Sequence, residues 1–190
     1  MTHLINTRRV VALAAGAVLA LVLAGCGSSS DEAGDHNNQD VTFVNDMIPH
    51  HAQAVEMSKF TATRASRPQV KELATKIEAA QQPEIDTMNG WLRSWDEPEV
   101  SDGSSSMGMD HGSGGSMGMM SDDAMNRLMS ASGGEFDRLF LEGMIEHHTG
   151  AIEMARTEQE KGKFEPAKTL AGSIISGQQA EIDEMRRLLA

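Results

Sequence analysis

Apolar residues recur at intervals of three and four along most of the chain, which is the spacing of one face of an α-helix. The pattern predicts four long helices and one short one, over residues 39–64, 68–95, 122–129, 134–161 and 165–189. End signals agree with these limits. Asn38 is the expected N-cap of the first helix, Ser132 and Glu135 have the spacing of a capping box, and Gly162 is a C-terminal stop.

The same pattern of residues occurs twice, in register, 97 residues apart. Residues 46–57 read DMIPHHAQAVEM, and residues 143–154 read GMIEHHTGAIEM. The match continues without a gap into the next helix, where QQPEIDTM at 81–88 corresponds to QQAEIDEM at 178–185. A gapless match of this length indicates an internal duplication. Two αα-hairpins with apolar stripes pack most simply as an antiparallel four-helix bundle, so we expect an all-α fold.

Each repeat places paired histidines beside methionines on the inward stripe of its helix. A turn of about 100° per residue puts Met47, His50 and Met57 on one stripe, with His51 at its edge. An imidazole beside a thioether suits a soft metal, above all Cu(I), better than Ca²⁺ or Mg²⁺. The alternative is a methionine stripe that fills the core, with histidines that are only hydrogen-bonded. The predicted ligands are Met47, His50, His51, Met57, Met144, His147, His148 and Met154.

The apolar stripe of the helix over residues 68–95 contains three side chains with oxygen, nitrogen or sulfur groups: Gln81, Glu84 and Met88. One interpretation makes Met88 a further ligand and uses Gln81 or Glu84 to orient the histidines through hydrogen bonds. The other is hydrogen bonding between helices in the core, with no metal involved.

The start of the chain predicts an export signal. A pair of arginines precedes an apolar run over residues 10–23, which has the length of a signal-peptide core and is short for a membrane span. The run ends in LAGC, which resembles the lipobox of bacterial lipoproteins. We therefore expect a signal peptide over residues 1–25, lipidation of Cys26, and a polar tether over residues 26–38 ahead of a single domain over residues 39–190. The alternative is a plain secretory signal with a chance cysteine.

Residues 97–121 form a low-complexity linker, EPEVSDGSSSMGMDHGSGGSMGMMS, that lies outside the duplication. Its Gly/Ser-rich composition predicts a segment that is disordered without a ligand. Methionine has no packing role in such a segment, whereas Met-Xaa-Met steps around a histidine make a flexible trap for Cu(I) or Ag(I). The alternatives are compositional drift and a hydrophobic contact site. The secondary ligands predicted here are Met107, Met109, His111, Met117 and Met119.

Composition narrows the classes of function. The formal net charge of −12 comes with no basic cluster, so nucleic acid is not an expected partner. Cys26 is the only cysteine, which excludes a disulfide within the chain. The expected partners are a metal ion, the lipid membrane through Cys26, and either metal-exchange proteins or a second copy of the chain.

The repeated motifs, His-His followed after four residues by Glu-Met, together with QQPEIDTM and QQAEIDEM, resemble the bacterial family known as domain of unknown function 305. The resemblance covers nearly all of the chain after the tether. It implies a ferritin-like four-helix bundle and similarity to periplasmic copper-binding proteins of copper resistance. It also implies that the paired histidines and their neighbouring methionines are the residues to test.

Three functions compete at this point. The first is an exported, lipid-anchored protein that binds Cu(I) or Ag(I) for buffering, transfer or resistance, with no catalytic role. The second is a ferritin-like di-iron or di-manganese oxidase, but its Glu-x-x-His signature is absent, since Met47, Ile48, Met144 and Ile145 stand three residues before the histidines. The third is a membrane-tethered interaction module with structural histidines.

Overall fold

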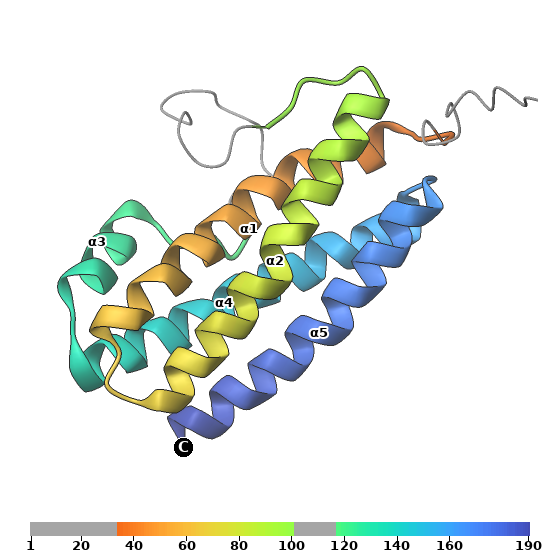
Figure 1. The fold of residues 1–190 in the computed structure, drawn as a ribbon. Coiled ribbons are helices and arrows are strands. Elements are labelled where there is room, and N and C mark those ends of the chain that lie inside the picture. Colours follow the sequence, from red (N-terminus) through yellow and green to blue (C-terminus); the bar gives the residue numbers. More distant parts are fainter. Residues whose placement is uncertain (1–33, 101–116) are drawn as a thin grey trace, which may run out of the picture.

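The computed structural model describes residues 34–100 and 117–190 of the chain (Figure 1). The described residues form five helices: α1 (Asn38–Arg64), α2 (Pro68–Ser94), α3 (Asp122–Ser130), α4 (Gly133–Lys161) and α5 (Glu165–Leu189). The predicted all-α fold is confirmed, and each helix limit differs from its prediction by at most one residue. The predicted signal peptide, Cys26, Met107, Met109 and His111 lie outside the described residues.

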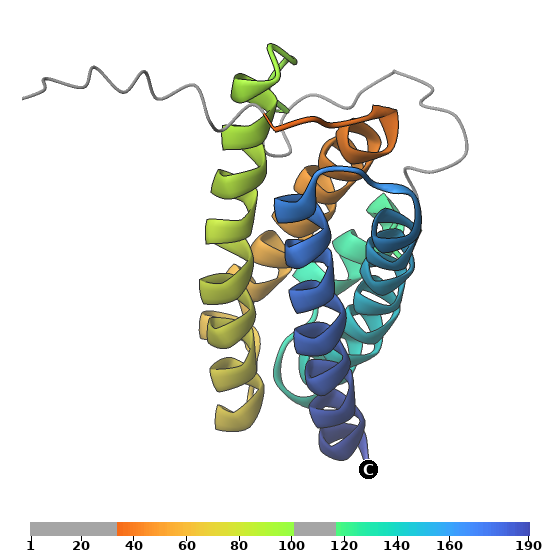
Figure 2. The same ribbon diagram turned by 90° about the vertical axis from the view of Figure 1, so that its right-hand side faces the viewer.

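The four long helices form an antiparallel bundle of two hairpins (Figures 1 and 2). α1 packs along α2, and α4 packs along α5. The two hairpins meet mainly where α1 lies against α4, while α2 and α5 touch much less. The short helix α3 leans on α4. None of these helices, as far as the structure describes them, is long and apolar enough to cross a membrane.

Two predictions about helix starts need correction. The N-cap of α1 is Asn37, not Asn38: its side chain accepts from the backbone of Gln39 and Asp40, and Asp40 accepts from the Asn37 N–H at 2.6 Å. The predicted capping box at Ser132 is wrong, because Ser132 makes no side-chain cap hydrogen bond. Gly133 there has a φ of 65°, a left-handed conformation that favours glycine and redirects the chain into α4.

The core consists of two apolar clusters that adjoin near the middle of α1 and α4. One cluster combines the first half of α1 with the second half of α4 and includes Phe43, Trp95 and Phe164. The other combines the second half of α1 with the first half of α4 and includes Phe136 and Phe140. Full burial of an aromatic or aliphatic side chain contributes about 1.5–3 kcal/mol. These clusters hold α1 and α4 in register where the paired histidines lie.

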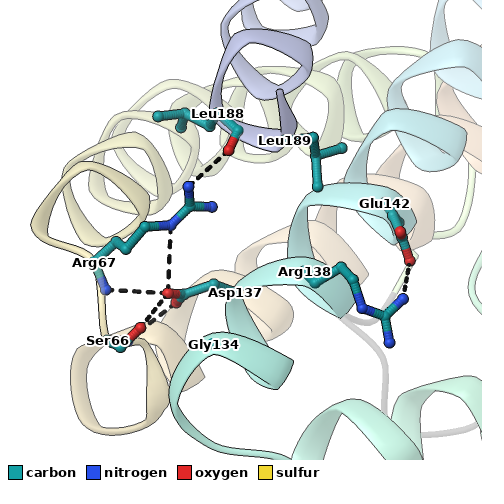
Figure 3. Close-up of a pocket in the computed structure, with 8 residues that line it drawn as sticks. All are labelled: Ser66, Arg67, Gly134, Asp137, Arg138, Glu142, Leu188 and Leu189. Carbon is teal, nitrogen blue, oxygen red and sulfur yellow. Dashed lines mark hydrogen bonds and ion pairs between the residues drawn. The ribbon is translucent and has the colours of Figure 1, made fainter.

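Each hairpin turn is held by an aspartate from the other hairpin. Asp137, at the start of α4, accepts from the backbone N–H groups of Ser66 at 3.0 Å and Arg67 at 3.1 Å, and from the Ser66 hydroxyl (Figure 3). Asp40, 97 residues earlier, accepts from the corresponding N–H groups of Lys163 at 3.0 Å and Phe164 at 2.9 Å. Both aspartates are buried. The two contacts fix the two hairpins against one another at both ends of the α1–α4 pair.

The two aspartate contacts differ in one respect. A second carboxyl group, that of Glu158, is buried beside Asp40. Burial and the neighbouring Asp40 raise the pKa of Glu158 from 4.5 to about 8. Burial alone would raise the pKa of Asp40 as well, but the Glu158 side chain and the surrounding backbone N–H groups outweigh it and lower that pKa. At neutral pH the pair therefore holds an ionised Asp40 and a protonated Glu158.

We expect Asp137→Ala to lower the free energy of unfolding by about 2–4 kcal/mol, since it removes a buried carboxylate and leaves two backbone N–H groups of the Ser66–Arg67 turn without their acceptor. Thermal or urea unfolding measures the loss. The control is Arg138→Ala on the same helix, which removes only an exposed ion pair with Glu142 and should cost less than about 1 kcal/mol (Figure 3). Equal effects of the two changes would contradict the assigned role of Asp137.

The Glu158 carboxyl group makes stability depend on pH. Its pKa is higher in the folded chain than in the unfolded one, so the folded state binds the proton more tightly between about pH 4.5 and 8. The contribution of Glu158 to stability should therefore fall as pH rises through this window and stop falling above it. Urea unfolding at a series of pH values should show the free energy of unfolding of wild type declining relative to that of Glu158→Gln through this window, since the buried histidines titrate alike in both proteins. An unchanged slope in the variant would show that Glu158 is not the titrating group.

Candidate metal centre

Both histidine pairs lie at the centre of the bundle, where the middle of α1 crosses the middle of α4. His50, His51, His147 and His148 are each at most 2% exposed. The ring centroids of His50 and His147 are 3.7 Å apart, so one imidazole from each hairpin touches the other. The sequence left open whether the pairs would meet or only occupy equivalent places. The antiparallel crossing of α1 and α4 brings them together.

A glutamate on the partner helix of each hairpin holds one histidine. His51 Nε2 lies 2.7 Å from a carboxylate oxygen of Glu84 on α2, and His148 Nε2 lies 2.7 Å from that of Glu181 on α5. The carboxylate accepts, so each ring donates a proton from Nε2, and in the neutral ring Nδ1 is the nitrogen with the lone pair. Neither Nδ1 atom has a hydrogen-bond partner among the residues that the structure describes. A carboxylate that fixes the ring in this way is the usual support for a histidine that ligates a metal.

The other two histidines differ from one another. His50 Nε2 donates to the backbone carbonyl of Met117 at 3.1 Å, whereas neither ring nitrogen of His147 makes a hydrogen bond of good geometry to the described residues, although the His50 backbone lies close enough to affect its pKa. Burial, followed by the nearby His51, lowers the pKa of His50 to about 3. Burial, followed by His50 and His148, also lowers the pKa of His147 well below its ordinary value. Both rings are therefore neutral at pH 7, which is the form that binds metal ions.

Several buried ring nitrogens of these histidines have no hydrogen-bond partner among the described residues. They are the Nδ1 atoms of all four rings and Nε2 of His147; amide atoms of Gln81 on α2 and Gln178 on α5 are also without a partner. Most buried polar side-chain atoms in proteins are hydrogen-bonded, so a group of unpartnered ones indicates a place built for a ligand. The donors at the crossing of α1 and α4 are imidazole nitrogens. This chemistry fits a transition-metal ion.

The predicted methionine ligands are buried on either side of the histidines. Met47 and Met154 belong to the cluster with Trp95, and Met57 and Met144 belong to the cluster with Phe136. Their thioethers therefore have a packing role in the core, and their role as ligands stays a prediction. In the linker, Met117 and Met119 lie within the described residues; the Met117 backbone contacts His50 on α1 and Gly150 on α4, and Met117 is 38% exposed.

The described side chains set one limit on the metal site. Among them, no three histidine, cysteine, aspartate or glutamate residues are arranged to hold a single ion together. An ion bound without rearrangement thus takes at most two ligands of these kinds, for instance imidazoles. Further ligands must come from other donors, such as thioethers, carbonyls or amides. Thioethers favour Cu(I) and Ag(I) over harder cations.

Sequence reasoning identified Glu84 as a candidate partner but did not identify Gln53 or the linker backbone. The side-chain amide of Gln53 exchanges two hydrogen bonds with the backbone of Met120, at 2.9 and 2.8 Å. The available signal was a break in the duplication, because the residue 97 positions after Gln53 is Gly150.

Comparisons with known proteins assign the chain to a family. The profile described as "Domain of unknown function (DUF305)" matches residues 40–189, so the chain belongs to this family. A member from Streptomyces coelicolor, described as secreted, is 35% identical with a TM-score of 0.70, over 80% of this chain and 90% of that one. The protein L153 of Acanthamoeba polyphaga mimivirus is 47% identical over 53 residues, which span 28% of this chain and 35% of the viral protein.

The chain is also similar to CopM. The Cu(I)-bound form of CopM is 29% identical with a TM-score of 0.64, over 78% of this chain and 94% of CopM. CopM is also known in Cu(II)-bound and Ag-bound forms.

The glutamate contacts predict the tautomers of His51 and His148. Long-range ¹H–¹⁵N NMR of the metal-free protein should show both rings protonated at Nε2. Glu84→Ala should change only the His51 signals, and Glu181→Ala, the matched variant in the other hairpin, only those of His148, because each removes one acceptor. Protonation of His51 at Nδ1 in the wild type would contradict the assignment.

Proposed function

We propose that this DUF305 chain is an exported, lipid-anchored protein that binds Cu(I) or Ag(I) for buffering, transfer or resistance. The observation that carries the proposal is the buried group of four imidazoles, two of them oriented by glutamates, with unpartnered Nδ1 atoms at the bundle centre. The likeness to a protein with Cu(I)-, Cu(II)- and Ag-bound forms supports it.

In this proposal the metal ion is cargo. Imidazole nitrogens drawn from His50, His51, His147 and His148 are the first donors, at most two to one ion without rearrangement, and thioethers of Met47, Met57, Met144 and Met154 supply soft donors from the adjoining clusters. The neutral state of His50 and His147 at pH 7 means that no proton has to leave these rings before an ion binds. The role is binding and not catalysis, because the Glu-x-x-His signature of di-metal oxidases is absent.

The cellular location rests on the sequence and on the relatives. The apolar run and LAGC motif support export and lipidation at Cys26. The Streptomyces coelicolor relative is described as secreted. The Met/His-rich linker would collect ions ahead of the buried site, with Met107, Met109, His111, Met117 and Met119 as its soft ligands. A metal-exchange protein or a second copy of the chain would receive the ion.

A Cu(I) titration against a competing chelator tests the binding function. It uses the chain begun after Cys26, as wild type and with all four paired histidines replaced by Asn. We expect the variant to bind about 100-fold more weakly or worse, since its imidazole ligands are gone. Circular dichroism establishes that the variant is folded.

The control removes thioethers from the linker, with Met107→Ala and Met109→Ala, and should weaken binding less than His50→Ala with His51→Ala. Loss of all binding in the linker variant would place the main site in the linker. Unchanged binding in the four-histidine variant would mean that the histidines are structural.

A further inference from the structure

The linker ends in a short segment, residues 117–120, that lies on α1 and α4 over the central histidines; we call it the latch. Its first carbonyl, that of Met117, accepts from His50 Nε2 at 3.1 Å. Its glycine, Gly118, has a φ of 75°, and a Cβ there would lie 2.6 Å from the carbonyl oxygen of Glu146 and 3.0 Å from that of His147. The latch thus contacts the backbone or side chain of both histidines that meet at the bundle centre.

A glutamine on α1 holds the other end of the latch. Gln53 Nε2 donates to the Met120 carbonyl at 2.9 Å, and the Met120 N–H donates to Gln53 Oε1 at 2.8 Å. This pair of bonds satisfies both backbone groups of one residue, as a neighbouring strand would. The Gly/Ser-rich composition of the linker gives no reason for such an attachment, so the position of the Met120 backbone depends on the Gln53 side chain.

Two glycines on α4 make room for the latch. A Cβ on Gly150 would collide with the Met117 carbonyl, and a Cβ on Gly143 would collide with the Met120 methyl group. Glycine in a helix interior costs about 1 kcal/mol relative to alanine, so its presence at both contacts indicates that space is needed there.

The contacts of the latch coincide with breaks in the duplication. Gln53 corresponds to Gly150, and Asp46 corresponds to Gly143, each 97 residues apart. At the first pair of positions, one repeat carries the side chain that holds the latch and the other repeat carries the glycine that accommodates it. The repeats therefore differ where a single segment must bind to a surface with approximate two-fold symmetry.

The latch also brings sulfur to the site. A Cβ on Gly143 would lie 4.0 Å from the Met120 sulfur and 3.8 Å from the methyl group of Met57, one of the predicted ligands. Met120 is thus a thioether that belongs to the linker but lies beside a buried methionine of the core. Closing the latch adds a soft donor to this neighbourhood, and opening it removes that donor and the contact with His50.

We propose that the latch is the gate of the buried site, that Gln53 is the positioning residue that keeps it closed, and that its opening sets how fast a soft metal ion reaches and leaves the central histidines. The proposal rests on the proposed function for the identity of the ion. His50 and His147 are buried, so an ion can reach them only if a segment of the chain moves. The latch is held by few hydrogen bonds, and it can open without the shift of a long helix.

The test compares wild type with Gln53→Ala and Gly150→Ala. Gln53→Ala removes the two hydrogen bonds to Met120. Gly150→Ala displaces the latch, although alanine stabilises the helix more than glycine does. Gln82→Ala is the control, since Gln82 is exposed on α2 and bonds only to Asp86 at 3.4 Å. Amide hydrogen exchange of Met120, without metal, should be at least about tenfold faster in both latch variants and unchanged in the control.

The second measurement is the rate at which Ag(I) leaves the loaded protein for a competing chelator. We expect release about tenfold faster in both latch variants than in wild type and in Gln82→Ala. Wild-type release rates in both latch variants would overturn the gate and leave the proposed function intact. Failure of wild type to bind Ag(I) or Cu(I) would overturn both. A Met120 amide that exchanges at the wild-type rate in Gln53→Ala would show that Gln53 does not hold the latch.

Discussion

The whole arrangement depends on burying four imidazoles between two apolar clusters. A buried polar atom without a partner costs about 1–3 kcal/mol, so several such atoms in one place are a considerable local cost. The flanking aromatic and aliphatic side chains offset this cost, and the two glutamates on α2 and α5 reduce it by binding one ring in each hairpin. What remains unpartnered is a set of nitrogen lone pairs that a metal ion can use.

The bundle holds this set in place through contacts between the hairpins. Asp40 and Asp137 each hold the turn of the opposite hairpin, so α1 and α4 cannot slide past one another without breaking both contacts. The latch lies on the α1–α4 face, where it contacts the His50 side chain and the backbone of His147. It makes His50 and His147 chemically different even though their positions in the two repeats correspond.

The repeated apolar pattern predicted the fold, the helix limits and the inward position of the paired histidines, because these follow from a helical period that is local in sequence. Glu84 was also among the candidate partners, since it lies on the inward stripe of α2. Contacts that join distant segments were not predictable in this way. The bonds from Gln53 to Met120 and from Asp137 to the Ser66–Arg67 turn depend on how the hairpins cross. Only the mismatch between Gln53 and Gly150 hinted at the first of them.

The unpartnered Nδ1 atoms are the groups that we propose bind a soft ion. The most direct measurement is ¹⁵N NMR of the histidine rings during addition of Ag(I). The Nδ1 resonances of His51 and His148 should shift and show coupling to silver, while their Nε2 resonances stay those of protonated nitrogens. Ag(I) that binds while all four rings keep their metal-free signals would contradict this proposal.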